Sequence, residues 1–349
     1  MSASRYLLLR LREVVQETRD AKSFVFEPPP EMALEQQRLF AYRPGQFLTL
    51  RLHLGDRHVP RCYSMASAPD LDQGLRITVK RVAGGRGSNW MCDHARAGAL
   101  FEVLAPAGVF TPSHLGDDFL LMAGGSGVTP IYSILRSALA ASASSRIFLL
   151  YANRDPESVI FAAQLLELQR AHPQRLQVLH WLESQQGLAS QQQLAEIARP
   201  WTAAQAFLCG PAGFMAACEQ ALLSLGMDGS RIHVERFASL ADEEAVVTPI
   251  APLAAGAIDR ARVEVHHQGQ WLHFECAGNE VVLDAALRAG IDLPHVCREG
   301  LCASCICQVQ SGSVLLRAND VLDERDLKKG WTLACQAIPT SERLTLKFA

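Results

Sequence analysis

Half of the ten cysteines gather near the end of this 349-residue chain, and their spacing constrains its fold more than any other feature. Cys297, Cys302 and Cys305 follow the pattern C-x4-C-x2-C, and Cys335 comes thirty positions later. Arginines interrupt the apolar start of the chain, so we expect neither a signal peptide nor a membrane span, and we predict a cytoplasmic location. In that reducing compartment a group of thiols indicates a metal site rather than disulfides.

This cysteine spacing is the ligand pattern of plant-type [2Fe–2S] ferredoxins. Two irons need four thiolates, and a tight loop that carries three of them can wrap a small cluster while its amides point at the sulfurs. A zinc site and structural cysteines are the alternatives, but zinc sites favour paired C-x2-C elements and the second pair is missing. We therefore predict a cluster on Cys297, Cys302, Cys305 and Cys335, and a small core role for Cys307.

The first third of the chain predicts a β-barrel. At 349 residues the chain exceeds one ordinary domain, so we expect two or three domains, each of roughly 100–150 residues. Residues 5–111 contain short strand-like segments separated by turns, such as Phe47–Leu52, which follows Pro44-Gly45, and Leu75–Lys80. Because this pattern is typical of antiparallel sheets, we predict an antiparallel β-barrel at residues 1–113.

The rest of the chain divides into an α/β domain, a linker and a small α+β domain. Apolar runs from residue 117 onward alternate with helical stretches, which indicates a parallel sheet with crossover helices at residues 114–240. Residues 241–258 contain two prolines and no clear period, so we interpret them as a linker before a domain at 259–349. The elements predicted in that domain are strands at Arg262–His266 and Trp271–Glu275 and a helix at Val281–Ala289 that ends at Gly290.

The segment Arg61-Cys62-Tyr63-Ser64, which follows a strand-like run, suits a flavin. An aromatic ring can stack on the isoalloxazine, an arginine can pair with the pyrophosphate, and a serine can hydrogen-bond near the flavin N5. Some twenty residues later, glycines precede a serine at a predicted helix start, where free amides favour phosphate. Taken singly, a surface turn and a capped glycine hairpin are the alternatives. The predicted FAD-binding residues are Arg61, Tyr63, Ser64, Gly85, Gly87 and Ser88.

Two glycine loops, each between a strand-like run and a helix, indicate a nicotinamide nucleotide site. In the first, Gly124–Gly127 lets a pyrophosphate approach the backbone, Thr129 can cap the helix and Pro130 fits its first position. In the second, the thiol of Cys209-Gly210-Pro211 can lie against the nicotinamide ring, and both loops would line one crevice at the carboxyl ends of parallel strands. Taken singly, a tight turn and a buried thiol are the alternatives. The predicted residues are Gly124, Gly125, Ser126, Gly127, Thr129, Cys209, Gly210 and Pro211.

Arg154 bears on the choice of coenzyme. It directly follows a strand-like run, where an arginine can meet the 2′-phosphate of NADPH. Asp155 comes next in the chain, so a surface ion pair between these two side chains is the alternative. From the residues alone, NADH and NADPH therefore both stay open, and Arg154 is a predicted nucleotide-binding residue.

These motifs together resemble the ferredoxin–NADP⁺ reductase superfamily, in the subgroup with a C-terminal plant-type ferredoxin, and they stand in the family's order over nearly the whole chain. The resemblance implies a six-stranded flavin barrel, a Rossmann-like nucleotide domain and a β-grasp ferredoxin domain. It implies that Glu235-Arg236-Phe237 approaches the flavin, with Phe237 as an FAD contact, although a plain domain-interface aromatic is the alternative. The residues expected at the hydride transfer are Ser64, Cys209 and Glu235.

One position departs from the family pattern. Ala303 follows the second cysteine, where the family usually has glycine, and its added methyl group should not prevent a cluster from forming.

A closer resemblance, carried by Tyr151–Phe161, His180–Ser184 and Asn319–Leu322, is to the reductase components of 3-ketosteroid 9α-hydroxylases. It implies NADH as coenzyme and a Rieske oxygenase as electron acceptor. Reductases of aromatic-ring oxygenases and of the phenylacetyl-CoA epoxidase type are the alternatives, because the oxygenase substrate never touches this chain.

The three predicted domains are the parts of an electron converter. NAD(P)H gives two electrons at once, a Rieske oxygenase accepts them singly, and a flavin with a one-electron cluster connects the two. The net charge of −3 gives no basic excess for nucleic acid. A redox sensor is the alternative from another class, but it would not need two nucleotide loops beside a flavin site. We therefore predict an NADH-dependent reductase component of a multicomponent oxygenase.

Overall fold

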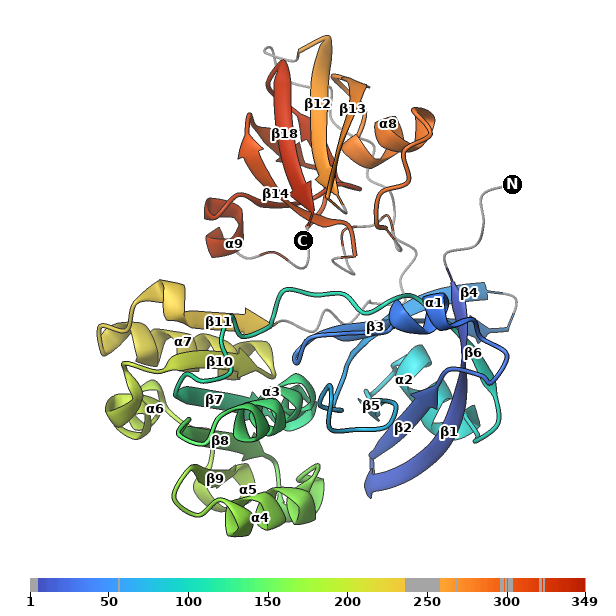
Figure 1. Ribbon diagram of the computed structural model, residues 1–349. Helices are drawn as coiled ribbons and strands as arrows, with labels where there is room; N and C mark the ends of the chain where they lie inside the picture. The colour runs from blue at the N-terminus through green and yellow to red at the C-terminus, as the bar shows by residue number, and fades with distance from the viewer. Residues whose placement is uncertain are drawn as a thin grey trace. The chain divides into compact units, whose positions relative to one another are not determined.

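The computed structural model describes residues 6–55, 57–235, 258–267, 269–295, 298, 300, 304–319, 322 and 324–348. The chain divides into two compact units, Met1–Phe237 and Ala238–Ala349. The first unit contains an antiparallel barrel and a parallel sheet with helices, and the second contains a mixed sheet (Figure 1). Across the described ranges, no helix is long and apolar enough to cross a membrane. Of the predicted linker, only Ile258 lies among the described residues.

Six antiparallel strands form the barrel of the first unit, in the spatial order β4-β3-β6-β1-β2-β5. A bridge between Met65 and Ile77 pairs the chain just after β4 with β5, which joins the two edges of the sheet and confirms the predicted barrel. Gly45 precedes β3 with a φ of 95°, a conformation that glycine adopts without strain. The elements are β1 (Leu7–Thr18), β2 (Ala21–Glu27), α1 (Leu34–Arg38), β3 (Phe47–Leu54), β4 (Arg57–Ser64), β5 (Leu75–Lys80), α2 (Arg86–His94) and β6 (Leu100–Val103).

A five-stranded parallel sheet follows, in the order β11-β10-β7-β8-β9, and confirms the predicted α/β fold. Its strands are β7 (Phe119–Gly124), β8 (Ile147–Asn153), β9 (Leu176–Leu182), β10 (Gln205–Cys209) and β11 (Ile232–Glu235). The main helices are α3 (Val128–Ala141), α4 (Ala162–Ala171), α6 (Gln191–Ala198) and α7 (Ala212–Ser224), and α5 (Glu183–Gln186) is one short turn after β9.

Alternating side chains of these strands bury the two faces of the sheet against different helices. Leu121 and Leu149 pack in one core with α3 and α4, whereas Leu120 and Met122 pack in another with α6 and α7. The chain runs outward from β7 through β8 to β9 on one side and continues through β10 to β11 on the other. The direction therefore reverses between β7 and β10, and open α/β sheets bind ligands at such a switch point.

The barrel and the α/β domain meet through one half-buried polar contact. The guanidinium of Arg136 on α3 donates to the carboxylate of Asp72, with 2.9 Å between Nη2 and Oδ1, and the Ser133 hydroxyl donates to the backbone oxygen of Ser67 at 2.6 Å. Burial raises the pKa of Asp72, but hydrogen bonds from Arg136 and a backbone amide outweigh it and hold that pKa below its usual value. The carboxylate therefore stays charged and the contact stays paired at neutral pH.

A second, more exposed polar contact joins the same two domains. Arg19 pairs with Asp155 at 2.9 Å, and Arg154 pairs with Asp20 at 2.8 Å. The sequence left open an ion pair between Arg154 and Asp155. In the structure each of these two side chains instead pairs with a residue of the barrel. Both carboxylate–guanidinium pairs connect residues more than 130 positions apart in the chain.

The second unit contains a mixed sheet in the order β13-β12-β18-β14-β16, in which β12 and β18 are parallel and the other pairs antiparallel. The two predicted strands and the predicted helix are confirmed, and Gly290 follows the helix with a φ of 77°. The elements are β12 (Arg260–His267), β13 (Gln270–Ala277), α8 (Val282–Arg288), β14 (Ile306–Ser311), β15 (Val314–Leu316), α9 (Glu324–Lys328), β16 (Trp331–Leu333), β17 (Ala337–Pro339) and β18 (Arg343–Phe348).

The expected cap at the first glycine loop is wrong. Residues Gly125–Gly127 form a 3₁₀ turn, and α3 begins at Val128, so Thr129 and Pro130 lie inside the helix. The Thr129 hydroxyl instead donates to the backbone oxygen of Ser126 at 3.1 Å. Glycine freedom explains the difference, because Gly125 has a φ of 53° and starts the turn early.

Candidate active site

The predicted flavin residues lie on two neighbouring elements of the barrel. Arg61 and Ser64 stand on β4, and Gly87 stands in the first turn of α2. A Cβ atom at Gly87 would lie 3.0 Å from Cγ and 3.1 Å from Nε of Arg61, so the arginine side chain passes directly over this glycine. The structure thus brings together the two flavin segments that the sequence separates.

The start of α2 offers backbone amides to an anion. Its N-cap residue is Gly85, and no described side chain caps the helix there. The Ser88 hydroxyl accepts a hydrogen bond from the backbone amide of Val82 at 3.2 Å and so holds the preceding turn against the helix. Uncapped amides at a helix start favour phosphate, which fits the pyrophosphate of a dinucleotide cofactor.

Tyr63 leaves a buried hydroxyl without a partner among the described residues. Burial raises the pKa of this phenol well above its ordinary value, so the hydroxyl is a neutral donor. An unsatisfied buried hydroxyl costs about 1–3 kcal/mol, and a bound polar group would remove that cost. Together with the amides of α2, this orphaned group shows that the residues present fit FAD.

The two glycine loops of the α/β domain are in direct contact. A Cβ atom at Gly124, the end of β7, would lie 2.6 Å from Cδ of Pro211, and one at Gly210 would lie 2.9 Å from Cα of Gly124. A Cβ atom at Gly127 would overlap the carbonyl oxygen of Cys209. Only glycine permits this approach, so the ends of β7 and β10 form one continuous backbone cradle.

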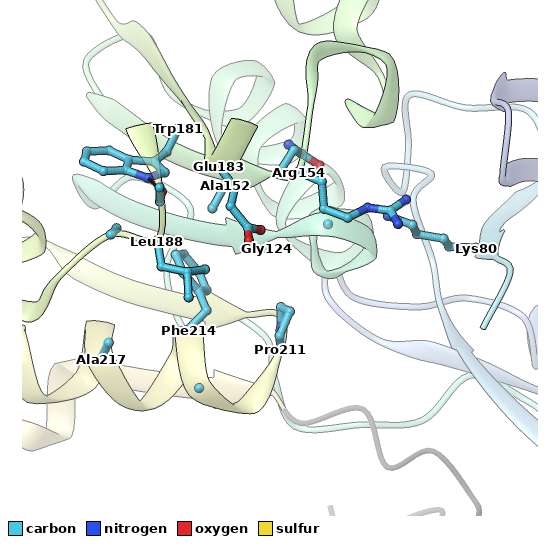
Figure 2. A pocket seen from close by; sticks show the side chains of 15 residues that line it. Lys80, Gly124, Ala152, Arg154, Trp181, Glu183, Leu188, Pro211, Phe214 and Ala217 are labelled. Carbon is cyan, nitrogen blue, oxygen red and sulfur yellow. Dashed lines mark hydrogen bonds between the residues drawn. The ribbon is translucent and has the colours of Figure 1, made fainter. Parts of the chain in front are cut away.

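A cavity of about 550 Å³ opens beside this cradle, at the carboxyl ends of β7, β8, β9 and β10 (Figure 2). Of the nine residues predicted for a nucleotide site, Gly124, Gly125, Arg154 and Pro211 line it, and Ser126, Gly127, Thr129, Cys209 and Gly210 do not. Its volume suits a small-molecule ligand or cofactor. Other lining side chains were missed from the sequence: Lys80, Trp181, Glu183, Leu188 and Phe214.

The missed residues give the cavity an apolar end. Trp181 at the end of β9 donates from Nε1 to the backbone oxygen of Gly187 at 2.8 Å, which fixes the indole against the following loop. Leu188 and Phe214 lie beside it in the cavity (Figure 2). No local pattern in the sequence distinguishes these residues, because they lie near the end of β9, after it or in α7 like any apolar residues at such positions.

Charged side chains gather at the other end of the cavity. Lys80 reaches over from β5 of the barrel, and its Nζ lies 3.7 Å from the position that a Cβ of Gly125 would take. The same ammonium lies 3.9 Å from Oδ2 of Asp20, the atom that also pairs with Arg154. Burial lowers the pKa of Lys80, while Asp20 opposes that effect. The barrel thus contributes charge to a site built mainly by the α/β domain.

Cys209 and Glu235 lie side by side, because they are register partners on β10 and β11. Cys209 is fully buried, and burial together with the nearby Glu235 raises the pKa of its thiol well above the ordinary value. The thiol is therefore protonated and does not act as a nucleophile. Phe237, the predicted flavin contact, lies outside the described residues.

Two of the four predicted cluster cysteines are described, and both are buried. Cys305 precedes β14, and Cys335 lies between β16 and β17. The backbone amide of Ala334 donates to the carbonyl oxygen of Cys305 at 3.0 Å, so the two thiol-bearing segments are hydrogen-bonded neighbours. Cys297 and Cys302 lie outside the described residues, as does Ala303.

A buried glutamine adds a donor beside these thiols. Nε2 of Gln336 donates to Sγ of Cys335 at 3.6 Å and to the backbone oxygen of Arg298 at 2.6 Å. Two buried thiols on hydrogen-bonded segments, with an N–H aimed at one of the sulfurs, fit an iron–sulfur cluster, whose sulfurs accept such hydrogen bonds. Cys307 is fully buried in β14 within the core of this unit, as predicted.

Three family models match the chain in the same order as these sites. They are an oxidoreductase FAD-binding domain at residues 8–111, an oxidoreductase NAD-binding domain at 121–220 and a 2Fe-2S iron–sulfur cluster binding domain at 265–340. The chain is 47% identical over 348 residues to the ferredoxin reductase component of 3-ketosteroid-9-alpha-monooxygenase from Rhodococcus rhodochrous, which covers 99% of this chain and 97% of that one.

The chain belongs to the ferredoxin–NADP⁺ reductase superfamily, in the group with a C-terminal [2Fe–2S] domain. It is an oxidoreductase that uses FAD, a nicotinamide nucleotide and a [2Fe–2S] cluster.

Two further proteins are similar over nearly the whole chain. One component of the 1,2-phenylacetyl-CoA epoxidase from Escherichia coli is 34% identical, with 97% of each chain covered. The solved structure of phthalate dioxygenase reductase matches with a TM-score of 0.60 at 24% identity, covers 98% of each chain and has the same fold. The three-domain architecture of this chain therefore recurs over the full length of a solved reductase.

Proposed function

We propose that this chain is the NADH-dependent reductase component of a Rieske-type 3-ketosteroid 9α-hydroxylase. The carrying observation is the 47% identity to such a reductase component over nearly the whole of both chains. The nucleotide cavity and the buried cysteine segments supply the parts that this role needs. The proposal includes a cytoplasmic location, where thiols stay reduced. It also includes three domains, at residues 1–113, 114–240 and 259–349.

Each group of residues has a binding role that follows from its position in the fold. FAD, when bound, takes two electrons together and gives them up singly, and the cluster carries one electron at a time. Tyr63 and Ser64 hold the flavin, while Arg61 and the amides of Gly85, Gly87 and Ser88 meet its pyrophosphate. The glycine cradle seats the nucleotide pyrophosphate, and positioning of the nicotinamide against the flavin supplies most of the rate.

The remaining roles are also proposals. Cys209 and Glu235 border the nicotinamide end of the cradle, where a neutral, buried thiol packs against the nicotinamide ring. Phe237 covers the flavin. Cys297, Cys302, Cys305 and Cys335 ligate the cluster, and Gly124 to Gly127, Thr129, Arg154, Gly210 and Pro211 shape the nucleotide site.

Reconstitution with candidate oxygenases tests the partner. We expect NADH-driven 9α-hydroxylation of a 3-ketosteroid when the purified reductase is mixed with a 3-ketosteroid hydroxylase. An aromatic-ring oxygenase and a phenylacetyl-CoA epoxidase serve as matched alternatives. Coupling that is at least as efficient with one of those as with the steroid enzyme would contradict the proposed partner.

The epoxidase partner is the second candidate, because a component of that system is 34% identical over 97% of both chains. A non-catalytic redox sensor is disfavoured by the cavity at the glycine loops, which such a protein would not need. Turnover of NADH with ferricyanide as acceptor separates an enzyme from a sensor, since a sensor without a nucleotide site would not oxidise NADH.

A further inference from the structure

We propose that Asp20, on the flavin barrel, makes this enzyme select NADH over NADPH, because it holds Arg154 away from the position of the adenosine ribose beside Glu183. The inference rests on the proposed function, because it takes the cavity as the site of the nicotinamide nucleotide. It adds a specificity role for a residue of the barrel that does not itself line the cavity.

The two ends of the cavity differ in chemistry, and this difference indicates where the adenosine ribose binds. The glycine cradle at Gly124 and Pro211 receives a pyrophosphate, and the apolar end at Trp181, Leu188 and Phe214 receives the adenine ring. The ribose between them must then lie in the middle of the cavity, on the side where β8 and β9 end.

Glu183 occupies that middle position. It is the first residue of α5, and the next residue, Ser184, donates from its backbone amide to the backbone oxygen of Arg154 at 2.8 Å. The Glu183 side chain therefore stands beside the end of β8 and points into the cavity (Figure 2). A carboxylate there accepts hydrogen bonds from the ribose hydroxyls, and it repels a phosphate on the 2′ oxygen.

Arg154 is the side chain that would counter this repulsion, and Asp20 holds it elsewhere. Its guanidinium extends away from Trp181 and toward Lys80 (Figure 2). There Nη2 lies 2.8 Å from Oδ2 of Asp20. Asp20 is itself anchored, since its Oδ1 accepts from the Thr18 hydroxyl at 2.9 Å and its backbone oxygen accepts from Arg81 at 2.7 Å.

Within the described lining of the cavity, no cation is left for a 2′-phosphate. Among the described lining residues the cations are Lys80 and Arg154, and both approach Asp20, at 3.9 and 2.8 Å. Lys80 also stands at the glycine loop, where the pyrophosphate binds. A 2′-phosphate adds close to two negative charges, and it would meet Glu183 with neither cation free to pair with it.

The experiment measures kcat/KM for NADH and for NADPH with ferricyanide as acceptor, in enzyme loaded with FAD. Asp20→Asn keeps the turn and the Thr18 hydrogen bond but weakens the hold on Arg154. We expect it to raise the NADPH-to-NADH ratio about tenfold, as expected for one charge-assisted hydrogen bond to phosphate. Glu183→Gln should raise the ratio by a similar factor, and the double variant should exceed either.

Two further variants test the route of the effect. With Arg154→Gln in the background, Asp20→Asn should no longer change the ratio, because Asp20 acts through that arginine. Arg19→Gln is the matched control, since it removes the other ion pair of the same domain contact, to Asp155, without touching Arg154. We expect the control to leave the ratio at its original value.

Competitive inhibition by adenosine 2′,5′-bisphosphate and by 5′-AMP provides a second readout that needs no hydride transfer from the inhibitor. Asp20→Asn should tighten the bisphosphate about tenfold and leave 5′-AMP unchanged. An unchanged coenzyme ratio in Asp20→Asn, with full flavin content, overturns the inference, while NADH turnover by the unaltered enzyme still supports a reductase. Absence of NADH turnover in the unaltered enzyme would instead overturn the proposed function.

Discussion

The nucleotide cavity and the cluster segments are built from different parts of the polypeptide. In the cavity, backbone meets backbone, because Gly124, Gly127 and Gly210 let the ends of β7 and β10 touch. The cluster segments are instead defined by side chains, because the thiols of Cys305 and Cys335 and the amide of Gln336 are all buried there. The first site should therefore be sensitive to added volume, and the second to a change of donor chemistry.

Removal of one ligand thiol is expected to have the largest effect. Cys305→Ser replaces a soft thiolate with a hydroxyl, so the [2Fe–2S] visible and EPR signals should disappear and electron delivery to an oxygenase should stop. Reduction of the flavin by NADH should continue, because that chemistry belongs to the other unit. Cys307→Ala, at the buried thiol of β14, is the control and should keep the cluster spectrum; a native spectrum in Cys305→Ser would refute the ligand assignment.

An added methyl group should damage the other site. In Gly127→Ala the new Cβ would overlap the carbonyl oxygen of Cys209, so β7 and β10 must separate. We expect flavin reduction by NADH, measured by stopped flow, to slow at least about tenfold while the iron content is unchanged. Gly116→Ala serves as control, since its Cβ would meet no atom within 4 Å. Equal rates in both variants would show that the cradle does not depend on this approach.

A smaller effect is expected from the donor beside the cluster. Gln336→Leu keeps the volume but removes the N–H that points at Sγ of Cys335. A hydrogen bond to sulfur favours the more negative, reduced cluster, so its loss should lower the midpoint potential by about 20–60 mV. Potentiometric EPR titration measures this shift. Gln310→Leu, on the exposed end of β14, should leave the potential where it is, and a shift of equal size there would remove the special role of Gln336.

The smallest effect is expected at the orphaned hydroxyl of the flavin site. Tyr63→Phe removes an oxygen that has no partner among the described residues, so the protein loses no internal hydrogen bond. If FAD supplies the missing partner, the dissociation constant for FAD should rise about threefold. Fluorescence titration of flavin release measures it. Unaltered FAD affinity would mean that the hydroxyl faces no cofactor atom.

Local signals in the sequence were sufficient for the elements that form the two sites. Leu75–Lys80 is both the predicted and the observed strand, and the glycine loops lie where apolar runs end. The four residues of β11, by contrast, were missed, because so short a strand has no periodicity of its own. Thr129 was misplaced as a cap because the sequence does not reveal which conformation three nearby glycines adopt.

Partners distant in the chain were beyond sequence reasoning. Arg154 was predicted as a nucleotide-binding residue and lines the cavity, but its pairing with Asp20 depends on how two domains meet. Glu183 resembled any polar residue after a strand, and only the cavity distinguishes it. Phe237, Cys297 and Cys302 lie outside the described residues, so their roles stay predictions.

The barrel and the α/β domain each supply charged side chains to the two ion-pair contacts between them, so neither domain is an interchangeable part. A chimera that joins the α/β domain to another barrel would leave the half-buried guanidinium of Arg136 without Asp72, at a cost of about 1–3 kcal/mol. It would also carry Arg154 into a new setting without Asp20, and with it an altered coenzyme preference. Recombination of this enzyme with its relatives is therefore best made between the two compact units, after Phe237, rather than between the barrel and the α/β domain.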